Sequence, residues 1–253
     1  IIDSKEGNDL VNGQAGNDSI TGASGDDTLS GGYGSDTLVG QEGSDTYLVD
    51  NVGDKVNETS VDLNYVDTVL SSINYTLGTN LDNLTLLGLD NLTGTGNSLN
   101  NSINGNSGNN LLDSKNGNDL VNGGKGDDTL FGREANDTLV GGDGVDRFNY
   151  NTGTACSGAD LGADRILDFT VSQDKIVLGK TTYGLKSIVG NSFSITTEFE
   201  SVATDDLAKG SQGRIAYSRG TGNLFYNPNG ATIGGESVLI TLDKPAIPNS
   251  MFP

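Results

Sequence analysis

The sequence contains no histidine and no tryptophan, and its 253 residues include a single cysteine, Cys156. Without histidine the chain cannot build a Ser-His-Asp or Cys-His catalytic site or an H-E-x-x-H zinc motif. One thiol and no imidazole leave almost no ligands for zinc. A lone cysteine also excludes an internal disulfide framework. Histidine-dependent hydrolases, zinc proteins and disulfide scaffolds are therefore set aside.

Basic residues are also scarce, because 14 lysines and arginines stand against 34 acidic residues, for a formal charge of -20. So acidic a chain argues against nucleic acid and anionic membranes as partners and favours metal cations. Long apolar runs are missing too, since stretches such as Leu84 to Leu89 are far too short to span a bilayer. No charged-then-apolar leader begins the chain, and Ile1 opens in the middle of a repeat pattern, so we expect a piece of a longer protein.

Signatures of enzymes are missing as well. No G-x-S-x-G elbow occurs, and Gly179-Lys180-Thr181 resembles a phosphate loop only in part, because Asp174 stands where the first glycine belongs. The D-x-D-x-D-G spacing of an EF-hand is absent. Carboxylate pairs of the kind that glycosidases use are abundant, but they recur in every repeat and so do not mark a unique site. We expect no enzyme in this chain, although a longer parent protein could contain one.

Aspartate or asparagine recurs every nine residues, each time two positions ahead of an apolar residue. The first series is Asp9, Asp18, Asp27, Asp36, Asp45 and Asp54, and the second is Asn110, Asp119, Asp128, Asp137 and Asp146. The apolar partners are Val11, Ile20, Leu29, Leu38, Tyr47 and Val56, and then Leu112, Val121, Leu130, Leu139 and Phe148. Such a period indicates structural units that bury their apolar face against their neighbours.

Each nine-residue unit predicts one turn and one short strand. In the unit from Gly31 to Val39, the glycines permit a tight turn, and Thr37, Leu38 and Val39 favour a strand with Leu38 pointing inward. Two units make one coil, so residues two units apart stack at about 4.8 Å. Stacked carboxylates at that spacing repel one another, by about 3 kcal/mol at an effective dielectric constant near 20. Calcium suits the gap, because it accepts six to eight oxygen ligands, including backbone carbonyls.

Gly31-Gly32-Tyr33-Gly34-Ser35-Asp36-Thr37-Leu38-Val39 fits the pattern G-G-x-G-x-D-x-U-x and resembles the repeats-in-toxin (RTX) family of type I-secreted bacterial proteins. The resemblance covers about residues 4–57 and 96–149. It implies an all-β fold, a right-handed parallel β-roll (a β-solenoid) with two nonapeptide-repeat blocks and a C-terminal β cap. It also implies several bound Ca²⁺ ions, a secreted, extracellular or cell-surface location, and the type I secretion machinery as a partner. We expect the chain to be disordered until calcium binds.

The resemblance further implies the ligands. An ion would lie between two stacked turns and take their aspartate side chains together with carbonyl groups from the first four turn positions. Asp18 and Asp36, for example, would share one ion with carbonyls of Gly13, Ala15, Gly32 and Gly34. The side-chain ligands would be the eleven aspartates and asparagines of the two series. The remaining ligands would be Ser4, Glu6, Gly13, Ala15, Gly22, Ala23, Ser24, Gly25, Gly32, Gly34, Gln41, Gly43, Gly105, Ser107, Ser114, Asn116, Gly123, Gly124, Lys125, Gly126, Arg133, Ala135, Gly142 and Gly144.

Three positions depart from the pattern. Ala135 replaces a turn glycine, the unit around Asp54 has lost its turn glycines, and Asn110 offers a neutral oxygen in place of a carboxylate. Any single aspartate is more simply a solvated turn residue, and only the strict register argues for metal binding. Sites that depend on Asp54 or Asn110 are therefore the least secure.

The period divides the chain into four segments: a first block at 1–57, an interruption at 58–95, a second block at 96–150, and a capping and secretion-signal region at 151–253. The distance from Val56 to Ile103 is not a multiple of nine, so the roll must be interrupted or change its coil length. Alternating apolar residues between 65 and 93 favour strands over helix. The Asn-rich stretch from Thr93 to Asn110 resumes the period, and its stacked asparagines could form side-chain ladders.

The C-terminal segment loses the period. It contains Asp164, Asp168 and Asp174, which could bind another ion or form salt links with Arg165 and Lys175. Leu224 to Gly230 reads as a strand that runs into a turn. A cap is physically necessary, since the last coil would otherwise expose strand edges and an apolar face. The final fifty residues resemble an uncleaved export signal.

These patterns favour a calcium-dependent folding module that supports type I secretion and stability of a larger exoprotein. Two alternatives stay open at this point. One is a module that binds extracellular polysaccharide or mediates adhesion, with Tyr33, Tyr47 and Phe131 lining its surface, or an ancillary module of a secreted protease, lipase or epimerase. The other is calcium storage in the cytosol, which would require sites tight enough for low free calcium.

Overall fold

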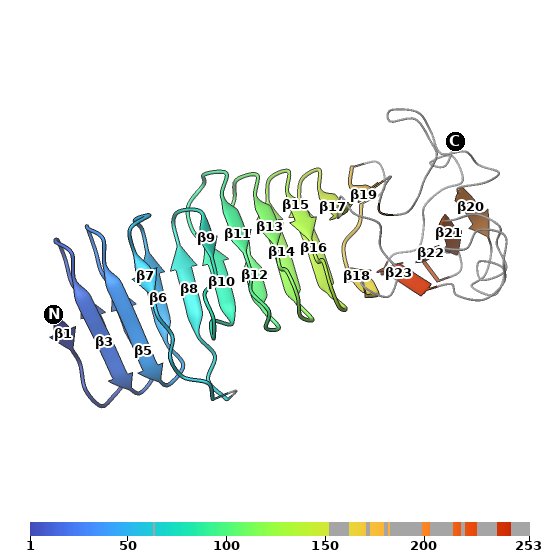
Figure 1. The fold of residues 1–253 in the computed structure, drawn as a ribbon. Coiled ribbons are helices and arrows are strands. Elements are labelled where there is room, and N and C mark those ends of the chain that lie inside the picture. The colour runs from blue at the N-terminus through green and yellow to red at the C-terminus, as the bar shows by residue number, and fades with distance from the viewer. Residues whose placement is uncertain are drawn as a thin grey trace.

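A computed structural model describes residues 1–62, 64–151, 162–170, 173–179, 182, 199–202, 215–218, 221–226 and 237–243. These residues form strands joined by tight turns, and the strands stack along one axis from the N-terminus toward the C-terminal segment (Figure 1). The described residues form no helix, and thus none that could cross a membrane.

The strands form three sheets. A continuous 13-stranded sheet has the order β2-β4-β6-β8-β10-β12-β14-β16-β18-β23-β22-β21-β20, and two flank sheets have the orders β1-β3-β5-β7 and β19-β17-β15-β13-β11-β9. The continuous sheet comprises β2 (Leu10–Asn12), β4 (Thr28–Ser30), β6 (Thr46–Val49), β8 (Thr68–Ser71), β10 (Asn83–Leu86), β12 (Ser102–Asn104), β14 (Leu120–Lys125), β16 (Thr138–Asp143), β18 (Asp164–Ile166), β20 (Phe199–Val202), β21 (Ile215–Ser218), β22 (Asn223–Tyr226) and β23 (Ser237–Leu242). The N-terminal flank sheet comprises β1 (Ile2–Asp3), β3 (Ser19–Ser24), β5 (Thr37–Glu42) and β7 (Lys55–Val56). The C-terminal flank sheet comprises β9 (Tyr75–Thr76), β11 (Thr93–Thr95), β13 (Leu111–Asp113), β15 (Thr129–Phe131), β17 (Arg147–Tyr150) and β19 (Lys175–Leu178).

Within both repeat blocks, successive coils pair in parallel with a shift of two repeat units. In the first block Val11 pairs with Leu29 and Ile20 with Leu38, and in the second Val121 pairs with Leu139. The predicted β-solenoid with two nine-residue units per coil is therefore confirmed. It follows from the sequence because each unit supplies one turn and one strand.

The apolar residue of each repeat forms the core between the two faces of the roll. Most are fully buried, as the period predicts: Ile20, Leu29, Leu38, Tyr47, Leu112, Val121, Leu130, Leu139 and Phe148. Val11 is 8 % exposed, and Val56, on the last strand of the N-terminal flank sheet, is only partly buried. The core therefore runs along the axis of the roll as a single column of apolar side chains.

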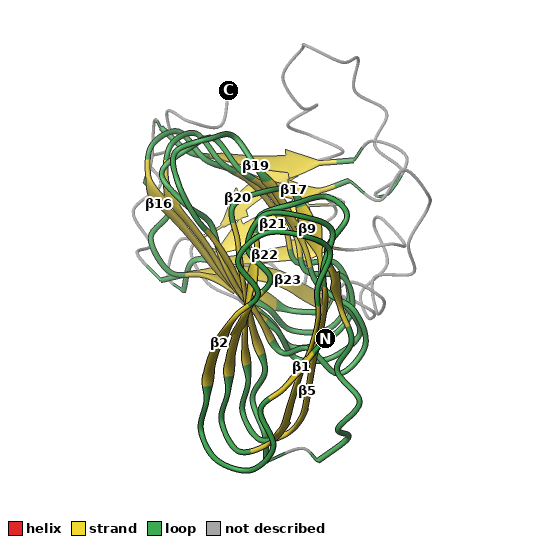
Figure 2. Ribbon diagram, turned by 90° about the vertical axis from the view of Figure 1, so that its left-hand side faces the viewer, coloured by secondary structure: helices red, strands yellow, loops and turns green. Residues whose placement is uncertain are grey.

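The interruption changes the coil length, as expected from the broken period. Along the continuous sheet Thr46 pairs with Thr68, Thr68 with Asn83, and Asn83 with Ser102, so the three coils differ in length from one another and from the repeat coils. Strands β8 to β11 confirm the prediction of strands in this segment. The flank side is not continuous, because β7 and β9 belong to different sheets. Figure 2 shows the N-terminal coils, with β2 and β5, turned relative to the coils that carry β16 and β17.

Beyond residue 151 the described strands continue the roll and then change direction. β18 and β19 add to the two sheets in parallel, β23 pairs with β18, and β22 runs antiparallel to both β21 and β23. β22 confirms the strand predicted at Leu224. The turn predicted to follow it, Cys156, Lys180 and Thr181, and most of the final fifty residues lie outside the described residues.

Candidate metal sites

The repeat aspartates stack in columns along the edges where each turn enters its strand. The long column follows the continuous sheet and consists of Asp9, Asp27, Asp45, Asp67, Asp82, Asn101, Asp119, Asp137 and Asp164. The flank side carries two short columns, Asp18, Asp36 and Asp54, and then Asn110, Asp128, Asp146 and Asp174. Most of the predicted side chains are thus brought together in stacked neighbours, and the structure adds members that lie outside the period.

One oxygen of each carboxylate holds the neighbouring coil. Oδ1 of Asp27 accepts a hydrogen bond from the backbone N–H of Asp9 at 2.8 Å, and Oδ1 of Asp36 accepts one from Asp18 at 2.7 Å. The same bond recurs in the second block and reaches the C-terminal strands, where Asp137 donates to Asp164 and Asp146 to Asp174, both at 3.0 Å. The carboxylates therefore serve as structural acceptors even without an ion.

The other oxygen has no partner. Oδ2 is buried and makes no hydrogen bond in ten aspartates: Asp9, Asp18, Asp27, Asp36, Asp45, Asp119, Asp128, Asp137, Asp146 and Asp164. A buried carboxylate oxygen without a donor costs free energy that only a proton or a cation can recover. This unpartnered oxygen recurs in ten aspartates, and the recurrence is the strongest sign in the structure that the columns bind cations.

Glycine at the first turn position lets Oδ2 pack directly against the backbone in seven of these aspartates: Asp18, Asp27, Asp36, Asp45, Asp128, Asp137 and Asp146. Asp9 and Asp119 have Ser4 and Ser114 at that position. A Cβ built on Gly13 would lie 2.8 Å from Asp18 Oδ2 and 2.7 Å from the carbonyl oxygen of Gly31 in the next coil. On Gly123 it would lie 2.4 Å from Asp128 Oδ2 and 2.5 Å from the carbonyl oxygen of Gly141. A carboxylate oxygen and a carbonyl oxygen from two coils therefore lie close together beside these glycines, and both are ligands of the kind that calcium accepts.

The stacked carboxylates have raised pKa values, because burial and neighbouring negative charges disfavour their ionised form. Burial raises the pKa of Asp119 and Asp146 to about 6, and that of Asp128 and Asp137 to about 7, with neighbouring carboxylates adding to the shift at Asp128, Asp137 and Asp146. Burial and the charge of Asp137 raise the pKa of Asp164 to about 8. Near neutral pH these carboxylates therefore bind protons in part, and the binding of a divalent cation would release those protons.

The donor set consists of oxygens alone, which favours a hard cation with several carboxylate and carbonyl ligands. The unpartnered Oδ2 atoms and the carbonyl oxygens beside them fit calcium, and the ion would neutralise the stacked charges. The fold and its sites together define a calcium-binding β-roll.

Comparison with known families agrees with this class. The profile of the RTX calcium-binding nonapeptide repeat matches the chain in four copies, at residues 1–29, 21–51, 95–130 and 123–154. The two repeat blocks therefore match the RTX calcium-binding nonapeptide repeat, as their sequence pattern predicts. A comparison with curated proteins gives no match.

The individual ligands stay predictions, although the structure shows how the turn carbonyls lie. The carbonyl of Ser24 accepts a hydrogen bond from Gly7 N–H, and that of Tyr33 accepts one from Gly16 N–H, both at 2.8 Å. A carbonyl oxygen has two lone pairs, so such a bond leaves it able to contact a cation. At Ala135 the backbone adopts φ 77°, in the left-handed region that Gly126 also occupies, so this departure changes the residue and not the turn.

The two insecure positions are satisfied without an ion. Asp54 Oδ2 accepts hydrogen bonds from the N–H groups of Asp50 and Asn51, at 3.2 and 3.0 Å. Asn110 bonds to Asn106 with both amide atoms, accepting its N–H at 2.8 Å and donating to its side-chain oxygen at 2.9 Å. Neither side chain leaves a buried oxygen free, which agrees with their departure from the pattern.

The asparagines do align, but they bond to backbone and not to one another in most coils. Asn100 Oδ1 accepts the N–H of Asn118, and Asn118 Oδ1 accepts that of Asn136, at 2.8 and 3.0 Å. The Asn97 amide donates to the carbonyls of Gly78 and Leu81. The ladder thus connects each coil to the next through side chain and backbone.

At the C-terminal end, Asp164, Asp168 and Asp174 were expected either to bind an ion or to form salt links, and the structure gives them different partners. Asp164 extends the long column, while Asp168 accepts the N–H groups of Gly141 and Gly142, at 2.9 and 2.8 Å. The suggested salt links of Arg165 with these aspartates are wrong, because Arg165 pairs with Asp243 at 2.6 Å. That pair connects β18 to the end of β23, the strand beside it in the sheet.

Sequence reasoning missed Asp67, Asp82 and Asn101 as members of the long column. Asp67 Oδ1 accepts the N–H of Asp45, and Asp82 Oδ2 accepts that of Asp67, each at 2.8 Å. A local signal was present, since each of the three residues stands two positions ahead of a buried apolar residue: Val69, Leu84 and Ile103. Asp67 and Asp82 fall outside the nine-residue period and so were not found, whereas Asn101 stands nine residues before Asn110 and could have been included.

Replacing Gly31 by alanine is expected to weaken the neighbouring calcium site. The new Cβ would lie 2.0 Å from Asp36 Oδ2 and 2.4 Å from Asp36 Cβ, so Asp36 must move out of its column. Overpacking of this kind costs about 1–3 kcal/mol. The measurement is the melting temperature with and without calcium, and the stabilisation by calcium should shrink.

Gly78→Ala is the matched control, since its Cβ would meet nothing closer than 3.7 Å. Neither Gly31 nor Gly78 has a positive φ, so the two variants differ mainly in available space. If calcium raised the melting temperature of both variants equally, the role assigned to glycine at the first turn position would be contradicted.

Proposed function

We propose that the chain is a calcium-dependent folding module of a secreted protein. The observation that carries the proposal is the set of ten buried Oδ2 atoms without a partner, stacked coil upon coil. Without calcium, the chain folds only if it buries these charges or protonates them. With calcium, the same oxygens become ligands that join adjacent coils.

The energetics favour a switch. At a free calcium concentration 100 times the dissociation constant, each site stabilises the folded state by about 2.7 kcal/mol. Several such sites are enough to tip the balance, because the burial of the apolar core nearly offsets the charge repulsion and the conformational entropy of a chain with 38 glycines. At the low free calcium of a bacterial cytosol the sites would stay empty and the roll would lose this stabilisation.

The proposal extends to location. A chain that is unfolded inside the cell can pass through a type I exporter and fold in calcium-rich surroundings outside, where it would support the stability of the longer protein. We infer a non-catalytic role for the roll itself, with any enzymatic activity in another domain of that protein. Retention of a reporter fused to this chain, in cells that carry a type I exporter, would contradict the export role.

The test is far-ultraviolet circular dichroism of the full chain during a calcium titration, with magnesium as the control ion. We expect a cooperative transition from coil to strand with calcium and little change with magnesium, because Mg²⁺ requires tighter octahedral geometry and retains its water. A full strand spectrum and a cooperative melt in the absence of calcium would end the proposal.

The polysaccharide-binding alternative loses two of its three aromatic residues. Tyr47 is fully buried in the core, so its assignment to a binding surface is wrong. The Phe131 ring is covered by the Arg133 guanidinium, whose carbon lies 4.5 Å from the ring centroid. Only Tyr33, 82 % exposed, stays available for stacking on a sugar.

A further inference from the structure

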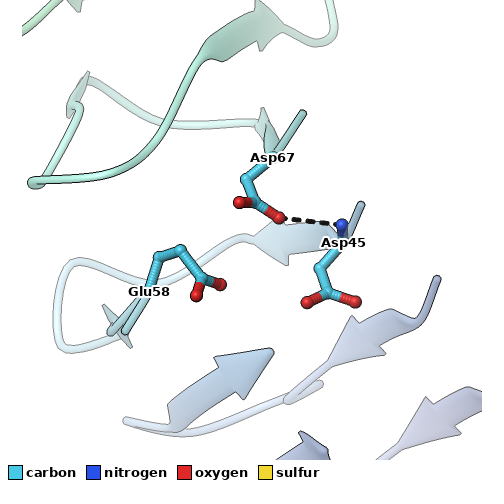
Figure 3. Close-up of side chains that lie close together, drawn as sticks. All are labelled: Asp45, Glu58 and Asp67. Atoms are coloured by element: carbon cyan, nitrogen blue, oxygen red, sulfur yellow. Dashed lines mark hydrogen bonds between the residues drawn. The ribbon is translucent and has the colours of Figure 1, made fainter. Parts of the chain in front are cut away.

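Three buried carboxylates meet where the first block passes into the interruption. Asp45 precedes β6, and Glu58 and Asp67 come from the interruption (Figure 3). One ligand oxygen from each lies within 4.8 Å of the other two, and the residues are 0 %, 6 % and 3 % exposed. Glu58 and Asp67 lie outside the residues that match the RTX repeat.

An unsatisfied oxygen points into this group. Asp45 Oδ2 is buried and has no hydrogen-bond partner. A Cβ built on Gly40 would lie 2.0 Å from Asp45 Oδ2 and 2.2 Å from the Tyr47 hydroxyl, which itself donates a hydrogen bond to Glu58 Oε2. The unpartnered oxygen therefore faces the same space as the Glu58 carboxylate.

The other carboxylates are held in place by hydrogen bonds. Glu58 Oε1 accepts the N–H of Ser60 at 2.6 Å, and Asp67 Oδ1 accepts that of Asp45 at 2.8 Å. None of the ion pairs formed by the described residues involves the three carboxylates. The charges are thus oriented but not neutralised by a basic side chain.

The register shows how this group differs from a repeat site. Glu58 follows Gly40 by two repeat lengths and so takes the first turn position, where most of the preceding repeats carry glycine. Asp67 takes the aspartate position, but it is displaced further along the chain from Asp45 than a repeat coil would place it. The interruption therefore supplies a carboxylate at a turn position that offers only a backbone carbonyl in those repeats.

We propose that Asp45, Glu58 and Asp67 form an additional Ca²⁺ site at this point of the long column, which differs from the repeat sites in its third carboxylate and fastens the interruption to the first block. Three carboxylates give it more negative charge than a repeat site with two, so it should bind the ion more tightly. All three ligands come from the single short stretch 45–67, so little of the chain must be ordered before the site can assemble.

The surroundings support ion access. Asp67 lines a cavity of about 520 Å³, together with Ser60, Asp62, Asn80 and Asp82, so an ion can reach the buried group from solvent. Burial raises the pKa of Asp45 to about 6 and that of Asp67 to about 7, with Glu58 adding to both shifts. Holding these carboxylates together without a cation is therefore costly.

The proposal rests on calcium binding by the roll but not on its unfolding without calcium. Tb³⁺ occupies calcium sites and emits when a nearby tyrosine transfers energy to it, so the buried Tyr47 marks this site. The full chain is titrated with Tb³⁺ and then with competing Ca²⁺, and folding is followed by circular dichroism. Tyr47→Phe should lose a component of the emission while all carboxylates are retained.

Glu58→Gln should raise the ion concentration needed for that component at least about tenfold, the loss that follows even from removing an outer-shell partner. Glu42→Gln is the matched control, because Glu42 is exposed and its loss changes the net charge equally. Unchanged emission in Tyr47→Phe, or equal titrations of the two glutamate variants, would overturn the proposal. If Glu58→Gln does not fold, Asp67→Asn is titrated in its place, because it removes one charge of the group and keeps the Oδ1 that accepts the Asp45 N–H. Folding without calcium would end only the switch proposed above, because the Tb³⁺ titration would still report the site.

Discussion

Asp128→Asn should stabilise the roll without calcium and destabilise it with calcium. The asparagine keeps the Oδ1 that accepts the Asn110 N–H at 2.7 Å, and its amide group would face the carbonyl of Gly141 beside Gly123. It removes a buried charge whose pKa burial raises to about 7. A raised pKa costs the ionised group roughly 1.4 kcal/mol per unit. After a discount for solvent screening and relaxation, the variant should gain on the order of 2 kcal/mol in free energy of unfolding at pH 8 without calcium. At calcium 100 times the dissociation constant, losing one site costs about 2.7 kcal/mol.

Thermal melts of the wild type and the variant measure this inversion, in excess calcium and, with calcium removed, in enough of a stabilising osmolyte to hold the calcium-free roll folded. Asp127→Asn is the control, because Asp127 is the adjacent residue, is exposed, and uses the same Oδ1 to accept the Val145 N–H. That variant should shift both melts little. A change of the same sign with and without calcium at Asp128 would show that the carboxylate acts only as a turn residue.

Acidification should partly replace calcium. In the unfolded chain aspartates titrate near pH 3.9, whereas burial in the roll raises the pKa of Asp119 to about 6, of Asp137 to about 7 and of Asp164 to about 8. Between about pH 4 and pH 8 the folded state thus binds more protons than the unfolded state. The free energy of unfolding of the calcium-free roll must then fall as the pH rises through this window, by several kcal/mol for the whole set.

Denaturation of the calcium-free chain at pH 4.5, 6 and 7.5, in a fixed concentration of an osmolyte that holds it folded, checks this expectation, with the same series in saturating calcium as the control. Bound calcium holds the carboxylates ionised, so its stabilising effect should grow with pH and oppose the loss. Stability of the calcium-free chain that is flat or rising over this range would contradict the buried, unneutralised state of the columns.

Much of this architecture could be predicted because each repeat encodes its own turn and strand. The spacing of Asp18 and Asp36, with Ile20 and Leu38 two residues on, determines which side chains point inward and which stack at the edge. No long-range information is needed, since every coil contacts only its neighbours. The calcium preference follows likewise from oxygen ligands recurring at one turn position.

The interruption could not be predicted to the same depth. Its coils are unequal because they are set by loops whose length carries no period, so Asp67 and Asp82 join the long column without a sequence register to announce it. Glu58 stands at a turn position where most of the preceding repeats carry glycine, so the repeat pattern gave no reason to expect a carboxylate near Asp45 from there. Tyr47 was assigned to a surface because aromatic residues stack on sugars, yet its place in the apolar series requires it to be buried.

The direction of the aspartate hydrogen bonds gives the roll two unlike ends. Each turn N–H is satisfied by the coil that follows it, so Asp137 and Asp146 depend on Asp164 and Asp174, which come from outside the repeats. Oδ1 of Asp9 and of Asp18 accepts no such bond from the described residues, so acceptors for a preceding coil are already in place. Tandem duplication can therefore lengthen a roll of this kind at its first coil, while any coil added at the other end must inherit Asp164 and Asp174 as its terminus.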